Sequence, residues 1–226
     1  MSQLAGGNAP AYDFSCIEPL ADSPLQGGHI AVLGSSVARG EASEGWAVGE
    51  YLAARLGTQL TKEAVSGTTL ADTGPQSYVR RLYRLDPNTR YDLFLCQLST
   101  NDATLHLPQG VVASGRDPAQ FDRATTLGAL ETILEYALRT WRCPVAVFTG
   151  SRYDSKDYAA LVACLPALRQ KWGIGVLDLW NSEPFNGIPD ASRRLYMRDP
   201  IHPTKAGYRD WWGPELERQL LAFLKQ

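Results

Sequence analysis

The chain contains a set of side chains that together could carry out acyl transfer. That chemistry needs a nucleophile, a base that takes its proton, a group that orients the base, and hydrogen-bond donors for the oxyanion. Ser35 and Ser36 each offer a hydroxyl, His202 offers a base, and Asp199, three residues before His202, can hold the second ring nitrogen. Gly67 offers a backbone N–H that a carbonyl oxygen can approach closely, and Asn101 offers a side-chain NH₂. The sequence therefore holds each group that a serine-dependent reaction on an ester requires.

These residues act together only if the fold brings them to one place, and the hydrophobic pattern indicates how. From Gly28 onward, short apolar runs alternate with longer helical patterns, which is typical of parallel strands joined by crossover helices. The predicted strands are 29–33, 59–65, 91–98, 145–149 and 175–179. The predicted helices are 46–56, 77–85, 117–141, 155–172 and 204–225. We therefore expect an α/β protein, a three-layer α/β/α sandwich around a flavodoxin-like, five-stranded parallel sheet.

The position of the polar residues relative to the predicted strands indicates where a site would lie. In an open parallel sheet, ligands bind at the carboxyl ends of the strands. Ser35 and Ser36 follow the first predicted strand, Gly67 follows the second and Asn101 follows the third, while His202 lies in the last long loop. We expect these segments to converge on one crevice.

Prolines and the N-terminal segment set the remaining boundaries. Asp117 and Pro118 have the types expected at the N-cap and first position of the longest helix. Pro214 is expected to kink the closing helix or to split it. Residues 1–27 show no clear period, and we interpret them as an N-terminal arm on a domain of residues 28–226.

Composition and charge argue against several functional classes. The 22 basic and 24 acidic residues give a net charge of −2 without a basic stripe, which disfavours a nucleic-acid binder. The most apolar stretch, 159–168, is too short to span a bilayer, which takes about 18–20 residues. No secretory signal is visible, so we expect a cytoplasmic protein without a membrane partner. Four widely spaced cysteines and three scattered histidines predict buried, reduced thiols and no metal or other cofactor.

In these segments the chain resembles the SGNH hydrolases, also called the GDSL esterase/lipase family. The blocks appear in family order as Val-Leu-Gly-Ser-Ser-Val at 32–37, Val-Ser-Gly at 65–67, Leu-Ser-Thr-Asn-Asp at 98–102, and Asp-Pro-Ile-His-Pro at 199–203. The resemblance covers about residues 28–215. It implies Ser36 as nucleophile, His202 as base and Asp199 as the group that orients it. It also implies an oxyanion hole made of the Ser36 N–H, the Gly67 N–H and the Asn101 side chain.

Two positions depart from the family pattern. Ser35 stands where the family usually has Asp, which leaves two adjacent serines as candidate nucleophiles, and we favour Ser36. Ser99 stands where the third block usually has Gly, which changes how closely the backbone can pass the site. Neither change removes a group on which the catalytic chemistry depends.

Other side chains flank the predicted strand ends and are candidates for the substrate pocket. For Trp46 and Met197, the alternative interpretation is packing in the core. For His106, the alternative is that it simply lies in the loop after Asn101 and does not line a pocket. The candidates are Ser35, Arg39, Trp46, Thr104, His106, Arg152, Tyr153 and Met197.

We therefore expect a serine esterase that cleaves a short-chain acyl ester, with acetyl favoured, of a carbohydrate or small metabolite through an acyl-enzyme. A lipase or thioesterase of the same family is an alternative, because the catalytic blocks do not report acyl length. A non-catalytic α/β domain that binds a small polar ligand is an alternative from another class. Residues 34–40 match neither a P-loop nor a GxGxxG motif, which argues against a nucleotide. The oligomeric state stays open, and a dimer is compatible with the charge.

Overall fold

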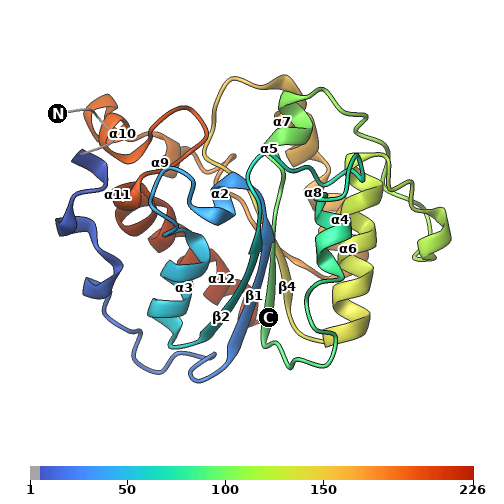
Figure 1. Ribbon diagram of the computed structural model, residues 1–226, viewed down its shortest axis with the longest axis horizontal. Coiled ribbons are helices and arrows are strands. Elements are labelled where there is room, and N and C mark those ends of the chain that lie inside the picture. The colour runs from blue at the N-terminus through green and yellow to red at the C-terminus, as the bar shows by residue number, and fades with distance from the viewer. Residues whose placement is uncertain (1–5) are drawn as a thin grey trace.

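A computed structural model describes residues 6–226, and a five-stranded parallel sheet forms its centre (Figure 1). All neighbouring strands pair in parallel, in the order β2-β1-β3-β4-β5. The strands are β1 (His29–Gly34), β2 (Gln59–Ala64), β3 (Leu93–Gln97), β4 (Val145–Phe148) and β5 (Gly175–Leu177). The predicted sheet and three-layer architecture are confirmed.

Helices cover both faces of the sheet (Figure 1). One face is covered by α3 (Val48–Leu56) and α12 (Gly213–Leu224). The other face is covered by α4 (Tyr78–Leu82), α6 (Thr126–Trp141), α7 (Lys156–Ala163) and α8 (Leu165–Trp172). The shorter helices are α2 (Ser36–Arg39), α5 (Thr100–Thr104), α9 (Glu183–Asn186), α10 (Asp190–Tyr196) and α11 (Lys205–Gly207). Because α2 and α5 directly follow β1 and β3, both begin at the carboxyl edge of the sheet.

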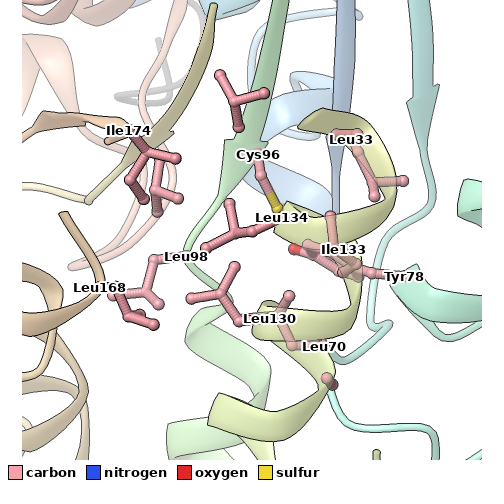
Figure 2. Close-up of a cluster of buried hydrophobic side chains, with 14 of the residues drawn as sticks. Leu33, Leu70, Tyr78, Cys96, Leu98, Leu130, Ile133, Leu134, Leu168 and Ile174 are labelled. Carbon is pink, nitrogen blue, oxygen red and sulfur yellow. The ribbon is translucent and has the colours of Figure 1, made fainter. Parts of the chain in front are cut away.

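The packing of the two helical layers explains the composition of the strands. β3 is buried along its whole length, because helices cover both of its faces. Figure 2 shows part of one layer, where Leu33 of β1 and Cys96 of β3 pack near Leu134 of α6. β2 lies at the edge and is more polar, and its Lys62 pairs with Glu50 of α3 at 2.6 Å. Charged side chains of this kind protect an edge strand from pairing with another chain.

The longest helix begins later than the sequence predicts. Asp117 caps only the short 3₁₀ turn Pro118–Gln120, where its carboxylate accepts the N–H of Ala119 at 3.0 Å. The helix α6 starts after Thr125, whose hydroxyl accepts the N–H of Gly128 at 3.2 Å. Side chains that accept nearby backbone N–H groups compete with continuous helix, so two caps produce two segments. The prediction of one helix over 117–141 was wrong at its N-terminal third.

Two other predicted helices consist of consecutive segments near prolines. Residues 155–172 form α7 and α8, because Pro166, at the start of α8, has no N–H to donate to the preceding turn. Residues 204–225 form α11, a π-helical turn (Tyr208–Trp212) and α12, which has Pro214 in its first turn. Trp212 and Gly213 keep right-handed helical dihedrals, so the backbone changes from π-helical to α-helical beside Pro214 without a break, and the predicted split at this proline is not observed. Both tryptophans of the π-helical turn are buried against the sheet layer.

The N-terminal segment, predicted as an arm over 1–27, packs against α3 and α11 where the structure describes it; residues 1–5 lie outside the described part. Phe14 is buried in the core cluster that includes α3. The side chain of Asn8 accepts the N–H of Lys205, the first residue of α11, at 2.9 Å. This segment therefore contributes to the same core layer as the closing helices.

The four cysteines are not paired with one another. Cys96 and Cys143 are buried, as predicted, and burial raises the pKa of the Cys143 thiol to about 11. Cys16 is exposed and Cys164 is partly exposed, so the expectation of burial was wrong for Cys16.

Candidate active site

A sharp turn connects β1 to α2, which begins with Ser36 and lies at the carboxyl edge of the sheet. Figure 1 shows α2 beside that end of the sheet. β1 ends at Gly34, and the turn requires a glycine there. A Cβ on Gly34 would lie 2.3 Å from the Cβ of Ala38 and 2.8 Å from Oε1 of Gln97. Ser36 is the first residue of α2, so its backbone N–H has no acceptor within the helix. The turn thus offers the hydroxyl and the backbone N–H of one residue at the same place.

His202 lies beside this serine, although 166 positions separate the two residues in the chain. Its Nε2 is 2.8 Å from the Oγ of Ser36. Its Nδ1 is 2.9 Å from both carboxylate oxygens of Asp199. The three side chains therefore form a continuous hydrogen-bonded series from carboxylate to imidazole to hydroxyl.

The carboxylate of Asp199 is held by its own loop. It accepts the backbone N–H groups of Ile201 and His202, each at 2.9 Å, and the Nε of Arg198 at 3.1 Å. Partial burial opposes ionisation, but these backbone hydrogen bonds and the His202 imidazole outweigh it and lower the pKa of Asp199. The group beside the imidazole is therefore a carboxylate at neutral pH.

Gly67 and Asn101, the two residues predicted to complete the oxyanion hole with Ser36, follow β2 and β3. These are the strands on either side of β1. The strand order β2-β1-β3 brings the ends of their strands to both sides of Ser36. Gly67 has a φ of +75°, a backbone conformation that favours glycine. The side-chain Nδ2 of Asn101 donates to the carbonyl of Thr68 at 2.8 Å, so the loop after β2 and the start of α5 are in contact.

The loop that carries Gly67 is also held by two buried charged residues that sequence reasoning missed. Arg81 of α4 is fully buried, and its Nη2 donates to the Gly34 carbonyl at 2.7 Å and to the Thr68 hydroxyl at 2.9 Å. The carboxylate of Asp102 accepts the N–H groups of Leu70 and Ala71, at 2.8 and 2.9 Å. Asp102 belongs to the Leu-Ser-Thr-Asn-Asp block at 98–102, and this was the available signal for it. For Arg81 the sequence offered no signal, because it is one of two adjacent arginines and nothing distinguishes it from Arg80.

The two adjacent serines differ in their surroundings. Ser35 is fully buried, and its hydroxyl accepts from Nε2 of Gln97 at 3.1 Å. Only Ser36 has a hydroxyl within hydrogen-bond distance of His202. Ser99, the other departure from the family pattern, is also buried, and its hydroxyl accepts the N–H of Asp102 at 3.3 Å as the N-cap of α5.

A cleft of about 490 Å³ lies next to Asp199. It is lined by three of the predicted pocket residues, Arg152, Tyr153 and Met197. Two others, Thr104 and His106, line a second cleft of about 540 Å³, which also contains Tyr153. In that second cleft the Nδ1 of His106 lies 2.5 Å from a carboxylate oxygen of Asp157, but the imidazole is mostly exposed.

The other three predicted pocket residues, Ser35, Arg39 and Trp46, line neither cleft. Arg39 lies near the Gly67 loop, where its Nη1 donates to the hydroxyl of Ser66 at 3.4 Å. The ring of Trp46 packs against Phe14, with the ring centroids 5.2 Å apart. Trp46 therefore joins the N-terminal segment to the domain.

Within residues 6–226, no group of three or more His, Cys, Asp or Glu side chains is placed to hold a metal ion. In the same part of the chain, no helix is long and apolar enough to cross a membrane.

The sequence matches the model of the GDSL-like lipase/acylhydrolase family over residues 32–209. No match was found among curated protein sequences.

Solved structures share the fold at low sequence identity. A protein from Lactobacillus plantarum is 20% identical, with a TM-score of 0.69, over 88% of this chain and 97% of its own. A possible lipase from Chitinophaga pinensis is 14% identical, with a TM-score of 0.60, over 87% of this chain and 99% of its own. A family two carbohydrate esterase from Cellvibrio japonicus is 19% identical, with a TM-score of 0.55, over 88% of this chain and 63% of its own.

Proposed function

Because the chain belongs to the GDSL-like lipase/acylhydrolase family and is a hydrolase, we propose that it is a serine esterase whose catalytic triad is Ser36, His202 and Asp199. The observation that carries this proposal is the 2.8 Å contact between Nε2 of His202 and Oγ of Ser36, made across most of the chain's length. The series from carboxylate to imidazole to hydroxyl is the arrangement that activates a serine for acyl transfer.

The geometry supports a definite role for each group. Asp199 accepts the N–H of Nδ1, which leaves a lone pair on Nε2 pointing to the serine. His202 takes the proton of Ser36 as the Oγ attacks the ester carbonyl carbon, and a tetrahedral oxyanion forms. The C–O bond to the alcohol then breaks, and His202 gives its proton to the leaving oxygen. Water attacks the acyl-enzyme in the same way, which releases the acid and regenerates the serine.

The oxyanion is stabilised in this proposal by the Ser36 N–H, the Gly67 N–H and the Asn101 amide. Donors fixed before the reaction stabilise the developing charge without reorganising, and removal of one such donor costs about 10²–10³ in kcat. The hydrogen bond from Asn101 to the Thr68 carbonyl supports this role, because it orients the amide and joins it to the Gly67 loop.

The cleft beside Asp199 supports a polar substrate. Its volume of about 490 Å³ is in the range of small-molecule sites. Seven of its ten lining residues are charged and can form hydrogen bonds with a polar alcohol portion: Arg152, Asp154, Asp190, Arg193, Arg194, Arg198 and Asp199. We therefore propose an acetyl or other short acyl ester of a carbohydrate or similar small polar molecule. The fold shared with a carbohydrate esterase agrees with this class.

Hydrolysis of a graded set of esters tests the proposal. p-Nitrophenyl acetate, butyrate and octanoate, together with an acetylated monosaccharide, are incubated with the wild-type protein and Ser36→Ala. We expect turnover in the wild type only, with kcat/KM falling from acetate to octanoate. A wild-type protein that is folded but hydrolyses none of these esters contradicts the esterase proposal. A higher kcat/KM for octanoate would contradict the short-acyl substrate and indicate a lipase. A higher kcat/KM for a thioester analogue would indicate a thioesterase.

A further inference from the structure

The first turn of α2 is not capped by its own N-cap side chain. Ser35 occupies the N-cap position, but its hydroxyl makes no hydrogen bond to the backbone of the helix. A side chain from the neighbouring strand takes that place. Oε1 of Gln97, the last residue of β3, accepts the N–H of Ser35 at 3.0 Å and the N–H of Ala38 at 2.9 Å. The N–H of Ala38 is the one that an N-cap side chain commonly receives.

The same glutamine also holds the side chain of Ser35. Its Nε2 donates to the Ser35 hydroxyl at 3.1 Å, so one amide group makes three hydrogen bonds to the turn. Gln97 is 2% exposed and Ser35 is fully buried, so water does not substitute readily for these bonds. Buried N–H groups need an acceptor, and here the only acceptor provided by the described chain for both is a single oxygen atom.

The residues that Gln97 holds lie on both sides of Ser36 in the chain. Ser36 lies between Ser35 and Ala38, whose N–H groups converge on Oε1 of Gln97. Gly34 packs against that oxygen as well, since a Cβ at Gly34 would lie 2.8 Å from it. The direction of the Ser36 backbone, and with it the Cα–Cβ bond and the N–H, therefore depends on where β3 places this amide.

We propose that Gln97 is the positioning residue of the serine turn: it caps α2 in place of Ser35 and fixes the Ser36 hydroxyl and N–H relative to His202. Gln97 acts through the backbone of α2. The inference rests on the proposed function of Ser36 and deepens it. It also explains how a serine is accommodated at position 35, because the adjacent strand supplies the acceptor that a longer N-cap side chain would supply.

Variants at position 97 test the proposal, because they distinguish the hydrogen bonds of the glutamine side chain from its volume. Gln97→Leu keeps the volume and removes all three hydrogen bonds. Gln97→Glu keeps the acceptor for both N–H groups and can accept from the Ser35 hydroxyl. We expect Gln97→Leu to lower kcat for p-nitrophenyl acetate about tenfold to a hundredfold with little change in KM, because small misplacements of reacting groups are costly. We expect Gln97→Glu to retain a higher kcat than Gln97→Leu, because it keeps an acceptor for both N–H groups, and to unfold more readily than the wild type, because burial of a carboxylate is costly.

Gln219 provides a matched control. It is a glutamine of α12 whose Oε1 accepts the N–H of Asp178 at 2.6 Å and whose Nε2 donates to the Asp178 carbonyl at 3.1 Å. Gln219→Leu removes comparable backbone contacts away from the serine turn. We expect it to lower the unfolding temperature and leave kcat unchanged. Equal kcat in Gln97→Leu and Gln219→Leu overturns the proposal.

Two further measurements keep the test decisive. If Gln97→Leu does not fold, Gln97→Asn keeps a polar amide that is too short to reach both N–H groups, and a wild-type kcat in that variant overturns the proposal. Amide hydrogen exchange at Ala38 reports the cap independently of activity: protection in the wild type and its loss in the folded variant at position 97 support the proposal, and equal exchange overturns it. An inactive wild type would contradict the esterase proposal, while the exchange result would still decide the role of Gln97.

Discussion

Ser36 and its neighbours are held by side chains buried beneath the edge of the sheet, whereas His202 lies on a partly exposed loop held mainly by bonds within that loop. On the serine side, Gln97 and Arg81 are 2% and 0% exposed and reach the turn from β3 and α4. On the histidine side, the Asp199 side chain is 35% exposed, and its partners lie within three positions in the chain.

In the proposed mechanism, this difference separates two kinds of structural constraint on the candidate site. Groups that hold the serine side also fill the core, so changes there affect folding and catalysis together. The histidine loop borders the cleft of about 490 Å³. Substitutions on that loop can therefore change catalysis or substrate choice while the domain stays folded.

Removal of the imidazole gives the largest expected effect on activity and tests the independence of the histidine loop. His202→Ala should lower kcat/KM for p-nitrophenyl acetate by about 10⁴-fold, as loss of a triad base does. Because the loop is held by its own backbone bonds, the unfolding temperature should stay close to that of the wild type. Steady-state kinetics and thermal unfolding measure both quantities, and a variant that is inactive because it is unfolded would contradict the comparison.

Asn101 lies on the serine side, and its removal should have an intermediate effect. Asn101→Ala should lower kcat about 10²–10³-fold through loss of one oxyanion donor. KM should change little, because the donor acts on the charge that develops in the transition state. Full activity in this variant would remove Asn101 from the oxyanion hole.

A pair of arginine variants compares the stability of the two sides. Arg81→Met removes a buried guanidinium and leaves the Gly34 carbonyl without this donor, so it should cost about 3 kcal/mol of unfolding free energy. Arg198→Met removes a partly exposed partner of Asp199 and should cost about 1 kcal/mol or less. Urea unfolding of both variants measures these values. Equal losses of unfolding free energy in the two variants would contradict the difference between the serine side and the histidine side.

Asp199 gives the smallest expected effect, a pH dependence of stability. Its pKa in the folded protein is lowered, with the opposing effect of burial outweighed by hydrogen bonds from Ile201 and His202. An unfolded Asp titrates near about 3.9. The contribution of the ionised carboxylate is therefore fully present above that value and is lost as the pH falls through the folded pKa. The stability difference between the wild type and Asp199→Asn, measured by urea unfolding, should shrink below about pH 4; a difference that grows there would contradict this sign.

The sheet could be predicted from the sequence because most strands are short apolar runs between turn residues, although the edge strand β2 is more polar. The order of polar residues after the strands indicated where the candidate site would lie. Helix ends were less predictable. The start of α6 depends on whether Asp117 or Thr125 provides the cap, and both side chains have the right chemistry. Competing local hydrogen bonds of similar strength leave no clear signal in the sequence.

The residues that support the serine turn could not be recognised from the sequence. Arg80 and Arg81 are adjacent and identical in type, yet the side chain of Arg80 is 59% exposed and that of Arg81 is fully buried. Gln97 contacts a turn 62 positions earlier in the chain. Such roles depend on which strands become neighbours, so they appear only once the sheet order is known.

Covalent labelling of the serine tests the central claim most directly. The wild-type protein, Ser36→Ala and Ser35→Ala are treated with a fluorophosphonate probe, and the modified residue is located by mass spectrometry. We predict one label, on Ser36, in the wild type and in Ser35→Ala, and none in Ser36→Ala. Labelling of Ser36→Ala at Ser35, or a folded wild-type protein that does not label, would contradict the assignment of Ser36 as the nucleophile activated by His202.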